Sequence, residues 1–414
     1  MPKLAVRSDH LLLTARGEEW LSNFDSADRG IARDLASALN LVSHNEFERG
    51  LTSLLRKALD SAGGPVALYA ARELPPAFEF ASASCDASGS IDATPQGADI
   101  GSEGRVASVI RNLSIEQPAK VLNHPTLERL RDSMVDAVIV VDDFIGSGKR
   151  CIDYLNKLWQ PKSVKSWVSY KRLQFMVVAY SSTMDGCRRV EGHTSRPTVN
   201  LFRHCPTIKS LHWKNDRVEE AMKLCRTYAK KAKLGSLAMG FQGTASLLVF
   251  EHGCPNNVPA IFWATAKGDK PWVALFPAKR IHSTIATAFP SEVIRRDPVH
   301  VLLEAGQKRL AMTLAAGAHR PLSDKEALVL ALFAHGRRRI ETIANATGLP
   351  AADAAKLLER CIEAGWISAR MRITDSGLKE LGGLRSASIR SLRGVPLLGA
   401  DEYHPVALRN RGNG

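Results

Sequence analysis

The sequence predicts an α/β protein: a parallel sheet with a helical N-terminal layer, followed by a winged helix-turn-helix domain. Short apolar runs, such as residues 66–70 and 138–141, alternate with stretches of helical periodicity, which is typical of a parallel sheet. Two acids and a glycine-rich loop follow the central run. After residue 321 the pattern changes to three short helices and a two-stranded wing. These observations predict two folded domains.

Composition limits the class of protein. The 414 residues suffice for two or three domains, and 45% hydrophobic with 24% charged residues is ordinary for a globular protein. No apolar run approaches the roughly 20 residues of a membrane span, and the N-terminus lacks a signal-peptide core, so we expect no membrane partner. Seven scattered cysteines indicate reduced thiols and a cytoplasmic location. The net charge of +14 favours polyanionic partners.

Residues 1–62 are expected to form the helical N-terminal layer. Ile31, Leu35 and Leu39 keep the spacing of a buried helical stripe. Ser43 and Glu46 have the spacing of a capping box for a second helix. The glycine pair at 63–64 ends that helix and begins the next domain, which we place at residues 63–282.

Further elements of the second domain follow in order. Residues 66–70 read as the first core strand, and residues 81–101 as a long loop. Gly101 and Ser102 then open a helix, where they would hold a second anion or only make an N-terminal turn. After the central strand, residues 166–170 and 175–180 are predicted as additional strands.

The central stretch, residues 138–150, carries the strongest chemical signal. Four aliphatic residues form a buried strand that ends at Asp142 and Asp143. A loop of Gly146, Ser147, Gly148 and Lys149 then leads into a helix. Ligands of parallel sheets bind at the carboxyl ends of strands, and glycine-rich loops before helices bind phosphate. The pattern therefore indicates a phosphorylated ribose, with its diol on the two acids and its phosphate on the loop.

Two other interpretations of this stretch stay open. A P-loop requires a glycine five positions before Gly148 and serine or threonine after the lysine, whereas this chain has Asp143 and Arg150 there. The second interpretation is a purely structural turn that binds no ligand. It would leave two adjacent acids at the end of a buried strand, which costs free energy unless they have a partner.

A second polar loop lies downstream of the sheet. Residues 247–250 and 258–263 are apolar, and the loop between them contains His252, Asn256 and Asn257. Asparagine and proline can also build such a turn without a ligand. Cys187, His193, His204 and Cys205 match no zinc spacing, so we expect no metal site built by the protein alone.

The C-terminal part divides into a helical connector at 283–320, a winged helix-turn-helix at 321–383 and a basic extended tail at 384–414. Ser323 and Glu326 have capping-box spacing for the first helix. Helices over 340–346 and 350–362 follow, and residues 365–368 and 371–374 are predicted to pair as the wing.

The winged helix offers several cations to a nucleic acid. The candidate contacts are Arg337, Arg338, Arg339, Lys356, Arg360, Arg370 and Arg372. Acids interrupt the expected recognition helix, so backbone contacts are favoured over base readout. Winged helices also serve as protein docking units, which is an open alternative.

The run from Val138 to Lys149 resembles the signature of phosphoribosyltransferases: four aliphatics, two acids, two mixed residues and a small-residue loop. By that resemblance, Asp142 and Asp143 hold the ribose hydroxyls of phosphoribosyl pyrophosphate, and Gly146 to Lys149 hold its 5′-phosphate. The family usually has threonine where this chain has Arg150. Phosphate binding is compatible with that difference, but ordinary transferase activity does not follow from it. The sequence assigns no cofactor of its own, and Mg²⁺ enters only as the companion of such a ligand.

Two downstream segments make the resemblance more specific. They are a Pro-Asn-Asn-x-Pro segment and a closing Leu-Phe-Pro run. With the acidic loop, they look like the phosphoribosyltransferase-like proteins of bacterial conflict systems over residues 15–282. This implies that His252, Asn256 and Asn257 line the same pocket. The pairing of such a domain with a winged helix is similar to the effector proteins of one class of retrons.

That resemblance implies an antiphage toxin that acts on a phosphoribosyl or nucleotide substrate, by transfer or by N-glycosidic cleavage. Its partners would be a reverse transcriptase and the RNA-linked DNA that it makes. Two other classes of function stay open: a ligand-sensing DNA-binding regulator without chemistry, and a structural adaptor in a nucleoprotein complex.

Overall fold

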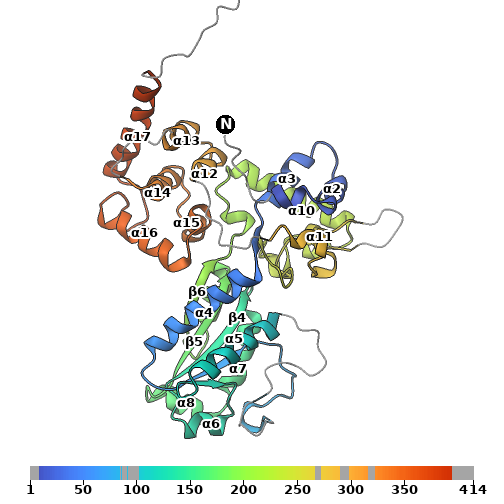
Figure 1. The fold of residues 1–414 in the computed structure, drawn as a ribbon, viewed down its shortest axis with the longest axis vertical. Coiled ribbons are helices and arrows are strands. Elements are labelled where there is room, and N and C mark those ends of the chain that lie inside the picture. The colour runs from blue at the N-terminus through green and yellow to red at the C-terminus, as the bar shows by residue number, and fades with distance from the viewer. Residues whose placement is uncertain are drawn as a thin grey trace, which may run out of the picture.

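A five-stranded parallel sheet forms the centre of the protein (Figure 1). The computed structural model describes residues 9–83, 85, 91, 102–265, 272–289, 298–315 and 322–393. The strand order is β3-β2-β4-β5-β6. The strands are β2 (Val66–Ala70), β3 (Val121–Asn123), β4 (Ala137–Ile145), β5 (Gln174–Ser182) and β6 (Thr198–His204). In chain order, β3 is placed on one side of β2 and strands β4 to β6 on the other, so the sheet is doubly wound. The strand order reverses between β2 and β4, which is where such sheets bind ligands.

Helices cover both faces of this sheet. One face carries α4 (His44–Ser61) and α5 (Ser102–Glu116), whose apolar stripes pack on side chains of β2, β4 and β5. The other face carries α6 (Leu127–Asp132), α7 (Lys149–Trp159), α8 (Lys162–Ser169) and α9 (Met184–Glu191). Every residue of β4 is buried, as expected for the middle strand of a covered parallel sheet.

The structure corrects one predicted strand. Residues 166–170 were expected to be extended, but they belong to helix α8 and its C-cap. Val164, Trp167 and Val168 follow helical spacing and pack on the sheet, and Pro161 stands at the N-cap of the helix. The aromatic and β-branched residues Trp167, Val168 and Tyr170 favour a strand locally, and tertiary packing of the apolar face overrides that preference.

The N-terminal residues contribute to two layers rather than one. Helices α1 (Asp9–Leu12), α2 (Ala15–Ser22) and α3 (Arg29–Ser37) share a core with α10 (Asn215–Lys231) and α11 (Ser283–Ala286). Trp20 stacks on Phe262 at 5.3 Å and donates to the Ile261 carbonyl at 2.8 Å. The predicted helical layer 1–62 is therefore interrupted, because β1 (Asn40–Val42) pairs in parallel with β7 (Leu248–Phe250).

The cap of α4 forms only half of the expected capping box. The Ser43 side chain accepts a hydrogen bond from the Glu46 backbone N–H at 3.2 Å. The Glu46 carboxylate does not return to Ser43. It accepts from the Tyr180 hydroxyl at 2.7 Å and pairs with Arg203 at 3.2 Å. Glu46 therefore joins α4 to the sheet.

Six helices follow the sheet domain in the described residues: α12 (Pro298–Glu304), α13 (Lys308–Ala315), α14 (Asp324–Ala334), α15 (Ile340–Thr347), α16 (Ala351–Glu363) and α17 (Asp375–Arg393). They share one apolar core. Ser323 and Glu326 form the predicted capping box at 3.3 and 2.8 Å. The wing is reduced to one bridge between Ile367 and Ile373.

The segment expected to be an extended tail begins as a helix. Helix α17 continues to Arg393, ten residues into the predicted tail 384–414. Leu381 and Leu384 are buried in the core of the winged helix, and this packing continues the helix. Residues 394–414 lie outside the described part of the chain.

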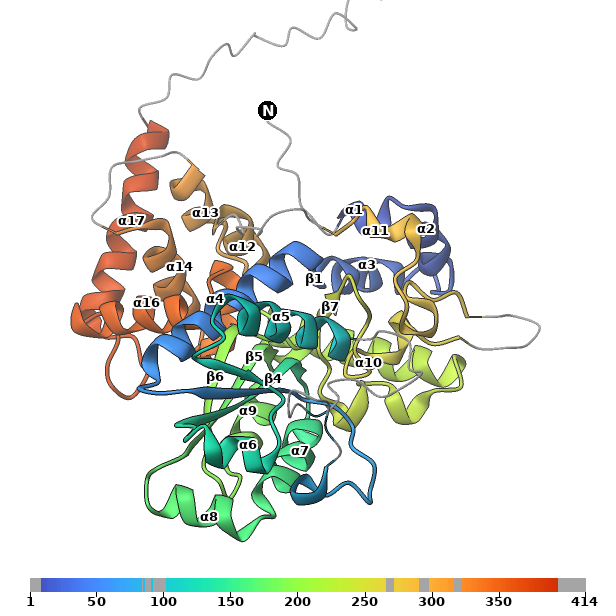
Figure 2. The same ribbon diagram turned by 60° about the horizontal axis from the view of Figure 1, so that its bottom comes forward.

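The winged helix packs against the sheet domain (Figures 1 and 2). Helices α15 and α16 contact β6, the outermost strand of the sheet, and residues 341–347 of α15 are all buried. His212 lies 2.5 Å from the Glu304 carboxylate of α12, and Arg337 donates to the Trp213 carbonyl. The helices thus cover the free edge of β6, which protects it from pairing with another strand.

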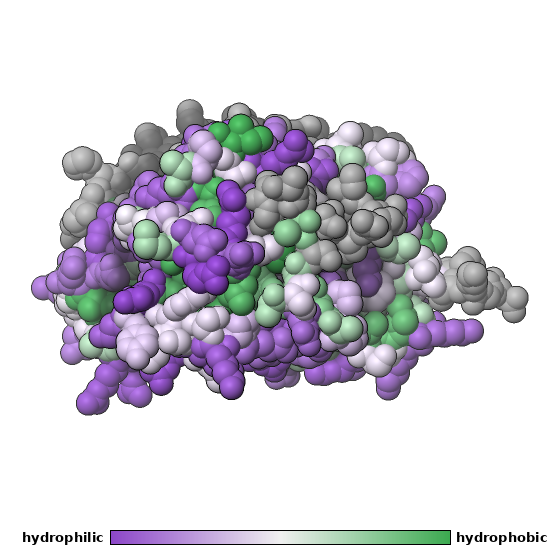
Figure 3. Space-filling model, turned by 90° about the horizontal axis from the view of Figure 1, so that it is seen from below, coloured by the Kyte–Doolittle hydropathy of each residue, from purple (hydrophilic) through white to green (hydrophobic). Residues whose placement is uncertain are grey.

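The opposite end of the molecule carries α6 and α8. Seen from that side (Figure 3), hydrophilic side chains dominate the rim and hydrophobic ones are interspersed among them. No helix in the described part of the chain is both long and apolar enough for a bilayer span.

The short 3₁₀ turns that connect these elements are η1 (Phe80–Ser82), η2 (Ile208–Ser210), η3 (Gly235–Leu237), η4 (Phe241–Gly243), η5 (Ala260–Phe262) and η6 (Pro277–Lys279). Two of them, η4 and η6, border the candidate site.

Candidate functional site

A cavity of about 670 Å³ lies at the carboxyl end of β4. Its lining includes Asp142, Asp143, the following loop, and residues of the segment after β7. The cavity is next to the point where the strand order reverses, since β2 and β4 are neighbours there. Strand β4 continues to Ile145 instead of ending at the acids, because Phe144 and Ile145 still pair with Ser181 and Ser182 of β5.

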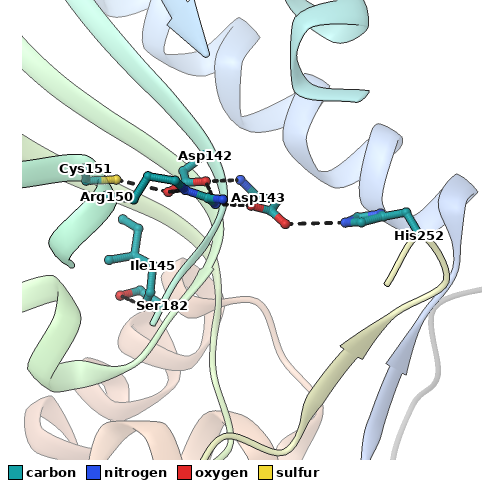
Figure 4. A network of polar contacts seen from close by, with 7 residues as sticks. All are labelled: Asp142, Asp143, Ile145, Arg150, Cys151, Ser182 and His252. Atoms are coloured by element: carbon teal, nitrogen blue, oxygen red, sulfur yellow. Dashed lines mark hydrogen bonds and ion pairs between the residues drawn. The ribbon is translucent and has the colours of Figure 1, made fainter. Parts of the chain in front are cut away.

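Arg150 pairs with both acids (Figure 4). Its guanidinium donates to the Asp142 carboxylate and, at 2.6 Å, to Asp143. Asp142 also accepts from the Asp143 backbone N–H at 2.9 Å and from the Cys151 thiol at 3.1 Å. The side chains of Asp142 and Asp143 are 2% and 8% exposed, whereas that of Arg150 is 30% exposed. The cation that neutralises the buried acids therefore lies on their solvent side.

The two carboxyls have opposite shifts in pKa. Burial raises the pKa of Asp142 to about 7, and the charge of Asp143 adds to the rise while Arg150 opposes it. Burial also acts to raise the pKa of Asp143, but Arg150 and His252 outweigh it and hold that pKa well below its usual range. Adjacent buried acids separate in this way because the first ionisation disfavours the second. The network therefore favours the ionised form of Asp143, whereas Asp142 is easier to protonate than an ordinary aspartate.

His252 extends this network from β7. Its Nε2 lies 3.4 Å from the Asp143 carboxylate, and the ring stacks on Phe250 with centroids 4.7 Å apart. The Nδ1 atom is buried and has no hydrogen-bond partner among the described residues. Such an unsatisfied buried group costs free energy. His252 is thus oriented by Asp143 and has one ring nitrogen unused.

The loop after β4 has the geometry of an anion site. Gly148 is the N-cap of α7 with φ of 81°, a left-handed conformation that glycine adopts without strain. Helix α7 has eleven residues, and its N-terminal N–H groups and dipole favour a negative charge. The Lys149 ammonium pairs with Asp153 at the surface. The loop backbone is therefore better placed for phosphate than the lysine side chain, which already has a carboxylate partner.

Asn257 supports this loop from the other side of the cavity. Its amide donates to the Thr244 hydroxyl at 3.0 Å and the Phe241 carbonyl at 3.4 Å, and the residue is 6% exposed. A Cβ atom on Gly146 would lie 2.2 Å from the Asn257 side chain. Asn257, which was expected to contact the ligand, thus donates its amide hydrogen bonds to the protein, whereas Asn256 beside it is exposed.

We expect Gly146→Ala to distort the loop. The added methyl overlaps the Asn257 amide, so either the loop or Asn257 must move, at a cost of about 1–3 kcal/mol in unfolding free energy. Urea unfolding measures this cost. Gly30→Ala is the matched control, because a Cβ there meets nothing within 4 Å. Equal stability of the two variants would contradict the close packing of Gly146 on Asn257.

The structure adds cavity residues that the sequence analysis did not name. Arg72 follows β2, the strand beside β4, is 8% exposed, and hydrogen-bonds to the Tyr154 hydroxyl. Lys279 reaches the cavity from η6, where its carbonyl accepts from the Cys254 N–H at 2.9 Å. The sequence could have indicated Arg72 as a cavity residue, because Arg72 stands just past the end of the first core strand. Nothing in the sequence indicates Lys279, since only tertiary folding brings η6 to the site.

Most of the predicted ligand residues meet in this cavity. The shared lining comprises Asp142, Asp143, Gly146, Ser147, Gly148, Lys149, Ser102, His252, Asn256 and Asn257. Gly101 lies outside the described residues. Ser102 begins α5, so this helix N-terminus also faces the cavity.

The predicted nucleic-acid contacts lie elsewhere. The exposed ones are Arg338, Arg339, Lys356, Arg360, Arg370 and Arg372. Arg337 differs, because it donates to the Trp213 carbonyl of the sheet domain. This hydrogen bond joins the winged helix to the sheet domain, and the assignment of Arg337 as a phosphate contact stays a prediction.

The acids do not form a metal site by themselves. The described residues contain no group of three or more His, Cys, Asp or Glu side chains arranged for a metal ion. Mg²⁺ commonly takes one or two carboxylates together with substrate phosphates. The acidic pair fits that shared arrangement, in which the ligand's own oxygens supply most of the coordination.

Comparison with known proteins agrees with this geometry. Neither a search of curated proteins nor a search of solved structures finds a match to the chain. The family model described as wHTH-PRTase associated matches residues 327–410, which include helices α15 to α17. The family model described as PRTase-CE matches residues 18–278, which are more than half of the chain and include the whole sheet and all of the cavity lining except Lys279. The chain is therefore a phosphoribosyltransferase-like protein joined to a winged helix-turn-helix, and it belongs to the PRTase-CE family.

Proposed function

We propose that the protein is a phosphoribosyltransferase-like effector of an antiphage defence system, which acts on a phosphoribosyl or nucleotide substrate. One observation carries the proposal: two buried acids and, after two intervening residues, a glycine-rich loop at a helix N-terminus line one cavity. This arrangement places hydroxyl acceptors close to a phosphate site. A phosphorylated ribose presents its diol and 5′-phosphate in the same combination.

In the proposed complex, the 5′-phosphate binds the N–H groups around Gly146 to Lys149. The ribose hydroxyls donate to Asp142 and Asp143. Arg150 has to release part of its contact with the acids as the sugar enters, and its solvent-side position allows this. The guanidinium then remains near the ligand, where it can pair with a phosphate oxygen.

The proposed chemistry occurs at C1 of the ribose. The bond from C1 to pyrophosphate or to a base breaks, and the leaving group takes the electron pair. Water or an acceptor nitrogen forms the new bond to C1 and gives up a proton. Asp143 is ionised and stabilises positive charge that develops on the sugar. His252 faces the same acid through Nε2 and holds its carboxylate in place.

We propose nucleic acid as the partner of the winged helix. Six of the seven predicted cations are exposed, and the net charge of +14 favours a polyanion. The pairing of a phosphoribosyltransferase-like part with a winged helix is similar to retron effectors, so we propose RNA-linked DNA and its reverse transcriptase as the partners. A cytoplasmic location follows from that role and from the seven free cysteines.

The test is a binding titration with phosphoribosyl pyrophosphate. Asp142→Asn combined with Asp143→Asn removes two charge-assisted hydrogen bonds, worth about 1.5–3 kcal/mol each, and should weaken binding by about 100- to 10,000-fold. Isothermal titration calorimetry measures the affinity. Asp132→Asn is the control, because that carboxylate is exposed and does not line the cavity. An unchanged affinity in the double variant would reject the ribose assignment.

A second candidate function is a regulator that senses a phosphoribosyl compound without chemistry. The pairing of Arg150 with both acids favours it, because the cation occupies the positions that a reacting sugar needs. Chromatography of the titration mixture after prolonged incubation separates the two functions. An effector releases pyrophosphate or free base, whereas a sensor binds the ligand and returns it unchanged.

A further inference from the structure

A second cavity, of about 430 Å³, lies on the other side of the phosphate loop. Gly146 and Ser147 line both cavities. The turn after Gly240 also separates them, since Phe241 faces the first cavity and Gln242 faces the second. The remaining walls come from the start of α9 and, across the domain boundary, from residues 339–341 of the winged helix.

The lining of this second cavity is basic. It contains four cations, Arg188, Arg189, Lys209 and Arg339, and two acids. The acids do not neutralise it strongly. Arg188 and Asp185 are 3.8 Å apart with side chains 71% and 83% exposed. Arg339 and Glu341 are 3.9 Å apart, with Arg339 66% exposed. Long ion pairs at such exposure contribute little, so these guanidinium groups are available to an anion.

Arg189 stands at the boundary between the two cavities. Its guanidinium donates to the Gln242 side-chain oxygen at 2.7 Å and to the Ser147 carbonyl at 3.4 Å. The residue therefore contacts the phosphate loop on one side and the η4 turn on the other. A cation at this boundary would meet a negatively charged group that continues from the first cavity into the second.

We propose that the second cavity binds the phosphodiester backbone of a single-stranded nucleic acid whose terminal nucleotide occupies the first cavity. The loop and the α7 N-terminus already serve one phosphate, so cations beyond the loop imply further phosphates. A cavity of about 430 Å³ between a loop and a domain boundary suits the backbone of one strand, which a single-stranded nucleic acid presents without a partner strand. The participation of Arg339 places the strand between the two domains. This inference rests on the proposed function in one respect, that the first cavity takes a phosphoribosyl group.

The experiment compares two triple variants of the full chain. One carries Arg188→Ala, Lys209→Ala and Arg339→Ala in the second cavity. The other carries Lys165→Ala, Lys171→Ala and Arg172→Ala, which remove the same charge from exposed residues at the amino ends of the strands. Fluorescence anisotropy with labelled oligothymidylate is recorded over a salt series, and thymidine monophosphate and phosphoribosyl pyrophosphate are titrated in parallel.

The cavity variant should bind the oligonucleotide about tenfold more weakly or worse. The slope of log affinity against log salt should fall by about 2, because each lost single-strand phosphate contact removes about 0.7. Affinity for the two small ligands should not change. Equal loss in the control variant, or weakened binding of thymidine monophosphate without an effect on the oligonucleotide, would overturn the inference. Absence of phosphoribosyl pyrophosphate binding in the wild type would instead reject the proposed function, because the salt slope reports the phosphodiester contacts separately.

Discussion

Replacing Arg150 with alanine should lower the free energy of unfolding by about 3–5 kcal/mol. Asp142 and Asp143 are nearly inaccessible, and Arg150 is the cation that both contact. Without it, two adjacent carboxyls remain buried, and burial together with mutual repulsion disfavours their ionised forms. Urea unfolding of the purified variant at neutral pH measures the loss.

Two further variants test whether the loss comes from the unpaired acids. Lys149→Ala breaks the neighbouring pair with Asp153, whose side chains are 62% and 56% exposed, so it should cost at most about 1 kcal/mol. Arg150→Ala combined with Asp142→Asn and Asp143→Asn should recover much of the lost stability, because the neutral amides need no counter-charge. If Arg150→Ala were as mild as Lys149→Ala, the cation would not be what stabilises the acids.

The parts of the candidate site that are contiguous in the chain could be predicted from the sequence. The acids, the loop and the following helix occupy residues 142–159, and local chemistry predicts their order and geometry. The winged helix was predicted for the same reason, since the Ser323 cap and the helix lengths are local features. The family models confirm both domains.

Other features depend on contacts between distant segments. Strands β1 and β7 have three residues each and exist because they pair with each other across about half of the chain. Asn257 belongs to the cavity wall but is held by Thr244, which no spacing in the sequence reveals. The pairing of Arg150 with the acids needs the first turn of α7 to fold back over the end of β4. The resemblance of the sequence to phosphoribosyltransferases indicates only that position 150 has arginine in place of the usual threonine.

Arg203→Ala should have a comparably large effect at the edge of the sheet, again about 3–5 kcal/mol in unfolding free energy. Arg203 and Glu46 have side chains 8% and 3% exposed and pair at 3.2 Å. The variant leaves Glu46 buried, with the hydrogen bond from the Tyr180 hydroxyl still in place. Urea unfolding measures the effect. The double variant Arg203→Ala with Glu46→Gln should recover part of the lost unfolding free energy.

This second prediction also concerns the contact between the domains. Arg203 lies on β6, the strand against which α15 and α16 pack, so loosening β6 should expose the backbone of α15. Hydrogen exchange of residues 341–347 should therefore become faster in Arg203→Ala, and return toward the wild-type rate in the double variant. Arg56→Ala is the control, because its pair with Glu116 is exposed and lies away from β6. Unchanged exchange in α15 would show that the winged helix is held by contacts such as that of Arg337 with Trp213, independently of the sheet edge.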